Sequence, residues 1–338
     1  MFSYKKGSIL PPKYVIWDCT RRCNLDCKHC GAKNKTYHTE LSTKQVKKLI
    51  KELVDYKVEY FTVTGGEPLI RKDLIEIFSY AKSNGLKTGL ATNGFLVNNK
   101  NCKKIAEVFD SVQVSLDGTE SIHNNIRGNP LAFQKAVNTI KLLRKYSCKQ
   151  ITVSSVFNPL NLNDFQNLAS LVKKLHVDIW KIISVMPIGK ISTDKSLYLD
   201  RKEFLRLLNL TNKYKKRYRG KPRIEFGENL GYLGKYDSSV RSEPFFCPVG
   251  FLSCCIGTNG IVRGCPEQPD IDSFQEGNIL ENNFSEIWEK GFKKYRELYY
   301  LRDSKCRKCK HRKECRGGCW VMRLDKIQCS TSRYSLNS

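Results

Sequence analysis

The sequence predicts an α/β protein, a partial (β/α)6 barrel of the TIM type followed by a small cysteine-rich C-terminal domain. Short apolar runs alternate with helical periodicity from Tyr14 to about Ser184, the pattern of repeated β-α units around a parallel sheet. A chain of 338 residues also exceeds what a single hydrophobic core usually supports. The second domain is indicated by nine of the 15 cysteines, which lie between Cys247 and Cys329.

Six apolar runs are the expected strands, and amphipathic stretches between them are the expected helices. The runs are Tyr14–Trp17, Tyr60–Val63, Lys87–Ala91, Ser111–Ser115, Ile151–Val156 and Ile179–Val185. The helical stretches include Thr43–Tyr56, Arg71–Asn84, Leu131–Tyr146, Asn163–Leu175 and Arg201–Tyr218. Right-handed crossovers place the carboxyl ends of parallel strands on one rim, so the residues that follow these strands are expected to meet there.

The expected domains follow from composition. We expect the barrel over residues 1–220, a linker rich in glycine, proline and charge over 221–242, and the cysteine-rich domain over 243–338. No stretch approaches 18 uninterrupted apolar residues, and the first 30 residues lack the pattern of a secretory signal. We therefore expect a cytoplasmic protein with no membrane partner, in which cysteines bind metal and do not form disulfides.

The formal charge of +26 is large, but the lysines are spread over many expected helices, as is typical of solvated helix faces. The densest basic runs, 213–223 and 305–316, could attract an acidic substrate or a nucleic acid. We favour solvated faces and do not expect a nucleic-acid partner. The alternative non-enzymatic function is that of a basic RNA-binding protein with structural clusters.

The loop after the first strand contains three spaced cysteines, Cys23, Cys27 and Cys30, in the segment CTRRCNLDCKHC. Three thiolates can hold a 4Fe-4S cluster and leave one iron open to an exogenous chelator. A structural zinc site with Cys19 as the fourth ligand is the alternative. We disfavour it because structural zinc loops prefer closely paired cysteines.

This loop resembles that of the radical S-adenosylmethionine (SAM) superfamily, in which the open iron binds the amino and carboxylate groups of SAM. The resemblance implies an enzyme that cleaves SAM reductively and uses the 5'-deoxyadenosyl radical to take a hydrogen atom from a substrate. It also implies a reducing partner such as flavodoxin or ferredoxin. His29 holds the place where this family usually has an aromatic residue near the adenine.

The segment after the second strand, Gly65, Gly66, Glu67 and Pro68, extends the resemblance. Glycines allow the backbone to approach a ligand closely, and a carboxylate beside them can receive an ammonium group. In the family this GGEP segment holds the amino group of SAM, which makes Glu67 the expected contact.

The third and fourth strands end in segments that resemble the TNG and SLDG segments of the family. The resemblance assigns Ser115 and Asp117 to the ribose hydroxyls, and it places Asn93 on the same rim, where a turn-forming role fits equally well. Arg127 matches an arginine that lies near the SAM carboxylate in many relatives. A surface charge is the alternative for that residue.

The C-terminal cysteines have the spacing of the SPASM extension of radical SAM enzymes. Seven of them, with either Cys254 or Cys255, make two sets of four, enough for two auxiliary 4Fe-4S clusters and three clusters in all. By resemblance the nearer cluster uses Cys247, Cys265, Cys319 and one of Cys254 and Cys255, and the farther cluster uses Cys306, Cys309, Cys315 and Cys329. The alternatives are clusters that act mainly as staples of the fold, and zinc fingers.

If only one of Cys254 and Cys255 binds the nearer cluster, the other thiol has no metal to bind. If it lies near the barrel mouth, it could act as a catalytic hydrogen donor to a substrate radical and direct the reaction toward epimerisation, whereas inert burial is the alternative. The resemblance implies a peptide or protein substrate, with oxidation, crosslinking or epimerisation as the reaction. A sugar, an aminoglycoside or a tetrapyrrole is the alternative substrate.

Overall fold

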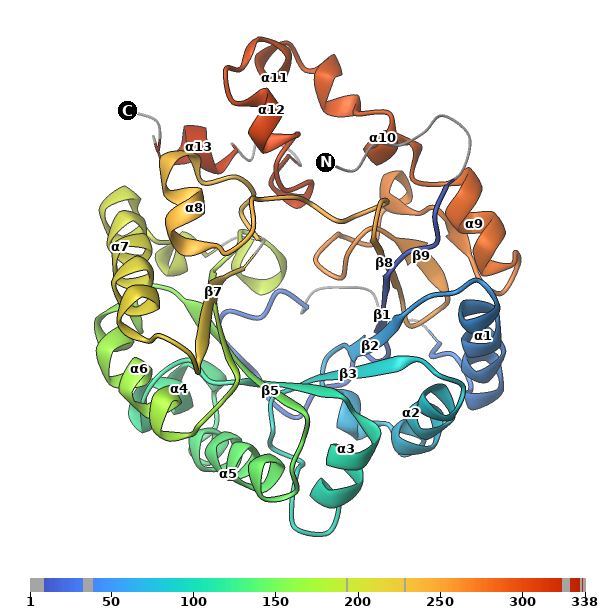
Figure 1. The fold of residues 1–338 in the computed structure, drawn as a ribbon, viewed down its shortest axis with the longest axis horizontal. Coiled ribbons are helices and arrows are strands. Elements are labelled where there is room, and N and C mark those ends of the chain that lie inside the picture. The colour runs from blue at the N-terminus through green and yellow to red at the C-terminus, as the bar shows by residue number, and fades with distance from the viewer. Residues whose placement is uncertain are drawn as a thin grey trace.

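The computed structural model describes residues 9–32, 39–192, 194–227, 229–323, 329–334 and 336. It confirms the expected α/β fold: helices surround a curved, mostly parallel sheet (Figure 1). The sheet order is β10-β9-β8-β1-β2-β3-β4-β5-β6-β7. The strands are β1 (Tyr14–Asp18), β2 (Tyr60–Thr64), β3 (Lys87–Thr92), β4 (Ser111–Ser115), β5 (Gln150–Phe157), β6 (Ile179–Ser184), β7 (Arg223–Phe226), β8 (Ser253–Ile256), β9 (Ile261–Arg263) and β10 (Gly277–Asn278).

Seven helices follow the barrel strands, and six shorter ones belong to the later part of the described chain. The first group is α1 (Thr43–Asp55), α2 (Leu74–Ser83), α3 (Cys102–Val108), α4 (Glu120–Arg127), α5 (Ala132–Lys145), α6 (Phe165–Lys174) and α7 (Arg201–Arg217). The second group is α8 (Asp237–Val240), α9 (Phe284–Lys290), α10 (Lys293–Arg296), α11 (Ser304–Lys308), α12 (Arg312–Cys315) and α13 (Ser330–Arg333).

Local sequence signals account for several helix ends. Capping boxes start two of the longer helices, with Ser42 and Gln45 at α1 and Asp200 and Glu203 at α7. Gly128 ends α4 in the left-handed conformation (φ 69°), which a glycine adopts without steric cost. The two capping boxes help to explain why the helices expected at 43–56 and 201–218 agree closely with α1 and α7.

An aromatic cluster fills the space between the sheet and the outer helices. The rings of Trp17 on β1 and Phe61 on β2 stack, and Phe78 on α2 packs against both. Since neighbouring residues of a strand point to opposite faces, the residue after Trp17, Asp18, points to the interior of the barrel. The strand period thus directs polar residues toward the carboxyl rim.

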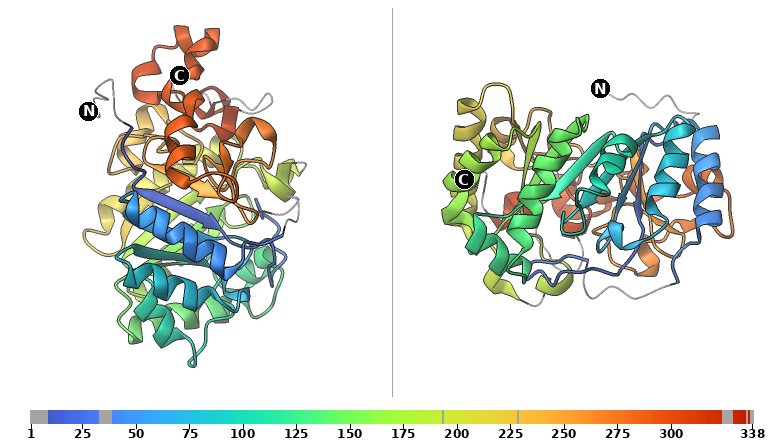
Figure 2. Two further views of the ribbon diagram at one scale, coloured as in Figure 1. Left: turned by 90° about the vertical axis from the view of Figure 1, so that its right-hand side faces the viewer. Right: turned by 90° about the horizontal axis from the view of Figure 1, so that it is seen from below.

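Two strands of the parallel sheet were not expected. β7 lies in the segment expected to be a linker and pairs with β6, while β8 lies in the expected second domain and pairs with β1. The C-terminal part of the chain therefore continues the barrel sheet before it forms the small helices at one end of the molecule (Figure 2). In the ranges given above, no helix is long and apolar enough to cross a lipid bilayer.

Candidate active site

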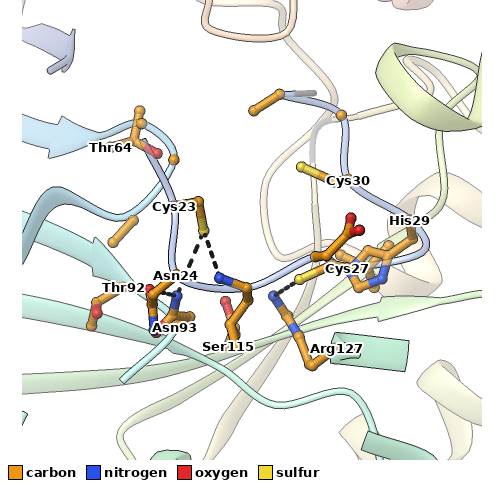
Figure 3. Close-up of a pocket in the computed structure, with 18 of the residues that line it drawn as sticks. Cys23, Asn24, Cys27, His29, Cys30, Thr64, Thr92, Asn93, Ser115 and Arg127 are labelled. Atoms are coloured by element: carbon orange, nitrogen blue, oxygen red, sulfur yellow. Dashed lines mark hydrogen bonds between the residues drawn. The ribbon is translucent and has the colours of Figure 1, made fainter. Parts of the chain in front are cut away.

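A cavity of about 910 Å³ opens where β2, β3 and β4 end. The three cysteines of the first loop, Cys23, Cys27 and Cys30, lie along one wall, and polar residues from the strand ends lie along the other (Figure 3). The structure thus brings the expected thiols and the strand-end segments to one place. Thr64, Thr92 and Ser115 are the last residues of their strands and all line this cavity.

Backbone hydrogen bonds hold the cysteine loop against three other segments. The amide of Gly66 donates to Thr20 O (2.7 Å), and the amide of Glu67 donates to Arg22 O (2.9 Å). Farther along the loop, the Lys28 amide donates to Ile126 O at the end of α4, and Cys30 O accepts from the Lys190 amide. The chain itself therefore positions the loop.

Gly65 and Gly66 are required by this contact. A Cβ atom on Gly65 would lie 2.6 Å from Thr20 O, and a Cβ atom on Gly66 would lie 2.2 Å from Arg22 O. Any side chain at either position would push the cysteine loop away from β2. The sequence analysis explained these glycines by the close approach of a ligand. The structure shows that the cysteine loop also approaches them closely.

N–H groups surround two of the three sulfur atoms. Cys23 Sγ accepts from the Leu25 amide (3.5 Å) and from Asn93 Nδ2 (3.9 Å), and Arg127 Nη1 donates to Cys27 Sγ (3.7 Å). Burial raises the pKa of the Cys27 thiol, while the Arg127 charge lowers it. Such donors suit sulfur atoms that carry negative charge, so the residues present fit the thiolate ligands of a cluster.

A buried ion pair lies beneath the cavity. Asp117 Oδ2 accepts from Arg127 Nε and Nη2, both at 2.6 Å, and Oδ1 accepts from the Val156 amide at 2.8 Å. Burial raises the pKa of Asp117, but the Arg127 charge and two nearby histidines lower it by more. The net shift of the pKa is therefore downward. Asp117 itself does not line the cavity, whereas Arg127 does.

His29 is buried beside this pair, with Nε2 3.8 Å from Asp117 Oδ2. Burial lowers its pKa to about 4, so the ring is neutral at pH 7. Its Nδ1 has no hydrogen-bond partner among the described residues. The ring lines the cavity, as expected for the residue before the third cysteine.

Glu67 is fully buried, and its carboxylate faces β3. Oε1 accepts from Thr92 Oγ1 (2.7 Å) and from the Leu69 amide (3.2 Å), and Oε2 accepts from the Asn93 amide (2.8 Å). Burial raises its pKa to about 7, against the lowering effect of these donors. With three donors satisfied and no exposed surface, Glu67 fixes the turn that carries Asn93.

The expected SAM contacts therefore separate into two groups. Those that line the cavity are His29, Gly65, Gly66, Asn93, Ser115 and Arg127. Those that do not are Glu67, Pro68 and Asp117. Of the second group, Glu67 and Asp117 support cavity residues from behind, through their hydrogen bonds to Asn93 and Arg127.

Asn24 and Gln113 are among the cavity residues that the sequence analysis did not name. Asn24 lines the cavity, and its Oδ1 accepts from Asn93 Nδ2 at 3.0 Å. Gln113 lies within β4, where it alternates with valines and shares the face of Ser115. A polar residue at period two in an apolar strand is the signal that could have identified it.

The C-terminal cysteines form two neighbourhoods. Burial raises the pKa of Cys265, and the charges of Glu267, Cys319, Cys247 and Cys255 raise it further. Burial likewise raises the pKa of Cys315 to about 12, with contributions from Cys329, Cys306 and Cys309. No disulfide joins any of the 15 cysteines, all of which are described.

Cys254 and Cys255 point to opposite faces of β8. Cys254 pairs in register with Val15 and packs in the hydrophobic core, whereas Cys255 pairs with Ile16. Both are fully buried, and neither lines the cavity. In the described ranges, no three His, Cys, Asp or Glu side chains converge closely enough to bind a single ion; cluster thiolates each bind a different iron and lie farther apart.

Sequence comparison identifies two regions. Residues 17–172 match the radical SAM superfamily, and residues 247–316 match the iron-sulfur cluster-binding SPASM domain. The chain is 30% identical to mycofactocin maturase MftC of Mycobacterium tuberculosis, over 93% of this chain and 79% of the maturase. It is 29% identical to the AdoMet-dependent heme synthase of Oleidesulfovibrio alaskensis, over 91% and 82% of the respective chains.

Solved structures share the fold. SuiB of Streptococcus suis bound to S-adenosylmethionine aligns with a TM-score of 0.76 and 17% identity, over 94% of this chain and 76% of SuiB. The protein anSMEcpe with bound AdoMet aligns with a TM-score of 0.74 and 20% identity, over 96% and 95%. From these matches and the cysteine loop at the barrel rim, the chain belongs to the radical SAM superfamily and carries a C-terminal SPASM domain.

Proposed function

We propose that the 910 Å³ cavity holds SAM beside a 4Fe-4S cluster on Cys23, Cys27 and Cys30, and that the chain cleaves SAM reductively. The observation that carries the proposal is the meeting of three thiols with polar groups from three strand ends in one cavity. When bound, the cluster and SAM supply a 5'-deoxyadenosyl radical that takes a hydrogen atom from the substrate. The electron comes from a small reducing protein such as flavodoxin or ferredoxin.

Residues that line the cavity bind SAM in this proposal, and buried carboxylates position them. Arg127 faces the SAM carboxylate, with its guanidinium held by Asp117. The backbone at Gly65 and Gly66 receives the amino group, and Asn93 and Ser115 serve the ribose. Glu67 acts through Asn93, since its carboxylate does not line the cavity.

Two auxiliary clusters complete the set of three. The neighbours of Cys265 support a cluster on Cys247, Cys255, Cys265 and Cys319. The neighbours of Cys315 support a second cluster on Cys306, Cys309, Cys315 and Cys329. This division makes Cys254 the cysteine left over, in agreement with its place in the hydrophobic core.

A peptide is the proposed substrate. Its support is the 30% identity to a maturase and the common fold with SuiB, which has also been solved bound to the precursor peptide SuiA. Oxidation is the proposed reaction, because Cys254 packs in the core and does not line the cavity, which removes support for a hydrogen donor. An auxiliary cluster would accept the electron left on the substrate.

A tetrapyrrole is the second candidate substrate. It is favoured by the similarity to heme synthases, since the chain is 28% identical to the AdoMet-dependent heme synthase of Methanosarcina barkeri. Iron coproporphyrin III, with four carboxylates, is a suitable probe. Stimulation of 5'-deoxyadenosine release by this macrocycle and not by peptides would favour the second candidate. A two-hydrogen mass loss from a peptide, without deuterium uptake from deuterated water, would favour the first.

The proposed reductive cleavage of SAM is tested under anaerobic conditions. The clusters are reconstituted, SAM and dithionite are added, and 5'-deoxyadenosine is measured by chromatography. We expect turnover in the wild type and a loss of about a thousandfold or more in Cys27→Ala, since removal of a group essential to the site removes most of the acceleration. Absence of 5'-deoxyadenosine from the fully reconstituted wild type would overturn the proposal.

A further inference from the structure

A smaller cavity of about 240 Å³ adjoins the large one. The two share part of their walls, at His29, Gly31, Ala32, Thr64, Gly65 and Val156. The small cavity continues between the ends of β1 and β6 to Pro266 and Glu267, directly after Cys265. Pockets for whole ligands usually measure about 300 to 1,000 Å³, so this side cavity suits one part of a larger substrate.

Asp18, the last residue of β1, lies in the wall of this side cavity and is 2% exposed. Its Oδ2 accepts from Arg21 Nη1 (2.5 Å) and from Arg263 Nη2 (3.1 Å). Its Oδ1 has no hydrogen-bond partner among the described residues. A buried carboxylate oxygen without a donor is costly, which points to a donor supplied by a ligand.

The charge on Asp18 is already balanced. Arg21 and Arg263 each also pair with Asp270, so two guanidinium groups meet two carboxylates. The open oxygen therefore calls for a neutral N–H or O–H group. Glu267 adds a further carboxylate to the wall, which disfavours an anionic ligand.

Other residues of the side cavity complement this acceptor. Ser184, which is 1% exposed, has a hydroxyl oxygen with no hydrogen-bond partner among the described residues, and it can donate. The remaining wall is apolar and consists mainly of Val156, Ile183, Val185, Met186 and Ile188. An acceptor, a donor and an aliphatic wall together match a carboxamide group next to an aliphatic side chain.

We propose that this side cavity binds the reacting residue of a peptide, with an amide N–H donating to Asp18 Oδ1 and the amide oxygen accepting from Ser184. Asp18 is then a specificity-determining residue that selects a neutral amide over a carboxylate. The inference rests on the proposed peptide-modifying function and names the place where the substrate meets the SAM cavity. Substrates rich in carboxylates, such as tetrapyrroles with propionate groups, do not fit this cavity.

The test compares two probes that share a side chain, N-acetyl-L-leucinamide and N-acetyl-L-leucine. Their binding to the cluster-loaded protein with SAM is measured by ligand-observed NMR under anaerobic conditions. We expect the wild type to bind the amide about tenfold more tightly than the acid, because the acid places a carboxylate against Asp18 and Glu267. Equal binding of the two probes, or tighter binding of the acid, would overturn the proposal.

Asp18→Asn sharpens the comparison. Guanidinium groups only donate, so the asparagine oxygen stays on Arg21 and Arg263, and its NH2 group turns to the cavity. The preference for the amide should fall about tenfold, as a donor replaces an acceptor. Asp270→Asn is the matched control, because it removes a carboxylate from the same two arginines without lining the cavity.

The preference in Asp270→Asn should fall less than in Asp18→Asn, because the acceptor oxygen of Asp18 that faces the ligand is kept. The same loss in both variants would show that the ionic network is only structural, and would contradict a role in recognition. Ser184→Ala leaves the network intact and should weaken amide binding severalfold, which keeps the proposal testable if Asp18→Asn does not fold. Because binding is read without turnover, a wild type that forms no 5'-deoxyadenosine would refute the proposed function and leave this result interpretable.

Discussion

The two cysteine-rich regions of this chain are held in place by different means. Backbone hydrogen bonds join the loop Cys19–Cys30 to the end of β2, the end of α4 and the segment after β6. By contrast, no residue from Leu301 to Arg316 is buried, and neither α11 nor α12 has a buried residue. We infer that protein contacts preform the first region, whereas the second depends on its clusters, as small metal-bound domains do.

The difference matters for function. In the proposed function, a preformed loop would leave the open position for SAM in one geometry, since it would not have to be ordered when the cofactor binds. The auxiliary region would have only to hold the proposed clusters at the end of the barrel. Changes to the metal ligands should therefore affect activity in one region and local structure in the other.

The largest expected effect is on the auxiliary region. Cys309→Ser should lose the proposed farther cluster. Backbone amides of residues 301–316 should then exchange with deuterium about tenfold faster or more, because little apolar burial holds them. Cys27→Ser is the matched control and should leave this exchange unchanged. Unchanged protection of 301–316 in Cys309→Ser would contradict the inferred dependence on the cluster.

An intermediate effect is expected at β8. Cys255→Ala should lose roughly four iron atoms per chain, the content of one 4Fe-4S cluster, because Cys255 lies near Cys265. Cys254→Ala should retain its iron, since that side chain packs in the core. Iron and sulfide analysis of the two reconstituted variants shows which of the two cysteines binds a cluster. Loss of iron from Cys254→Ala alone would reverse the assignment.

The last expected effect concerns the pH dependence of stability in the preformed region. Burial raises the pKa of Glu67 from 4.5 to about 7. A folded pKa above the unfolded one means that its contribution is full below about pH 4.5 and is lost as the pH rises through 7, by up to about 3 kcal/mol. Glu67→Gln should remove this part of the dependence.

Denaturant unfolding at pH 5 and pH 7.5 measures the effect. The gap in stability between Glu67→Gln and the wild type should move in favour of the variant at the higher pH. Glu107→Gln, a change of an exposed glutamate on α3, is the control and should leave the wild-type dependence in place. Parallel pH profiles for all three proteins would show that Glu67 does not titrate in this range.

Much of the barrel was predictable because its strands and helices follow simple periods. β4 has the bounds that the sequence predicts, and the other five expected strands differ by one residue at one end or, in β5, at each end. β7 was missed because it has only two apolar residues, which alternate with Arg223 and Glu225. β8 was missed because its cysteines were interpreted as metal ligands. Such short strands are defined by their neighbours in the sheet and not by their own pattern.

The candidate site was predictable from motifs, but the direction of its side chains was not. Glu67 and Asp117 stand in the expected segments, yet their carboxylates bond to β3 and to Arg127 and do not line the cavity. Asp18 had no motif at all. Its proposed role depends on Arg263 of β9, which lies 245 positions away in the sequence and reaches it because β9 pairs with β8 and β8 pairs with β1.

The most direct test of the central claim is electron paramagnetic resonance of the reduced protein before and after addition of SAM. If SAM binds at the three-thiol site, the spectrum should change in the wild type and in Cys309→Ser, and it should not respond to SAM in Cys27→Ser. A response to SAM that persists in Cys27→Ser would contradict the claim that Cys23, Cys27 and Cys30 form the site of SAM cleavage.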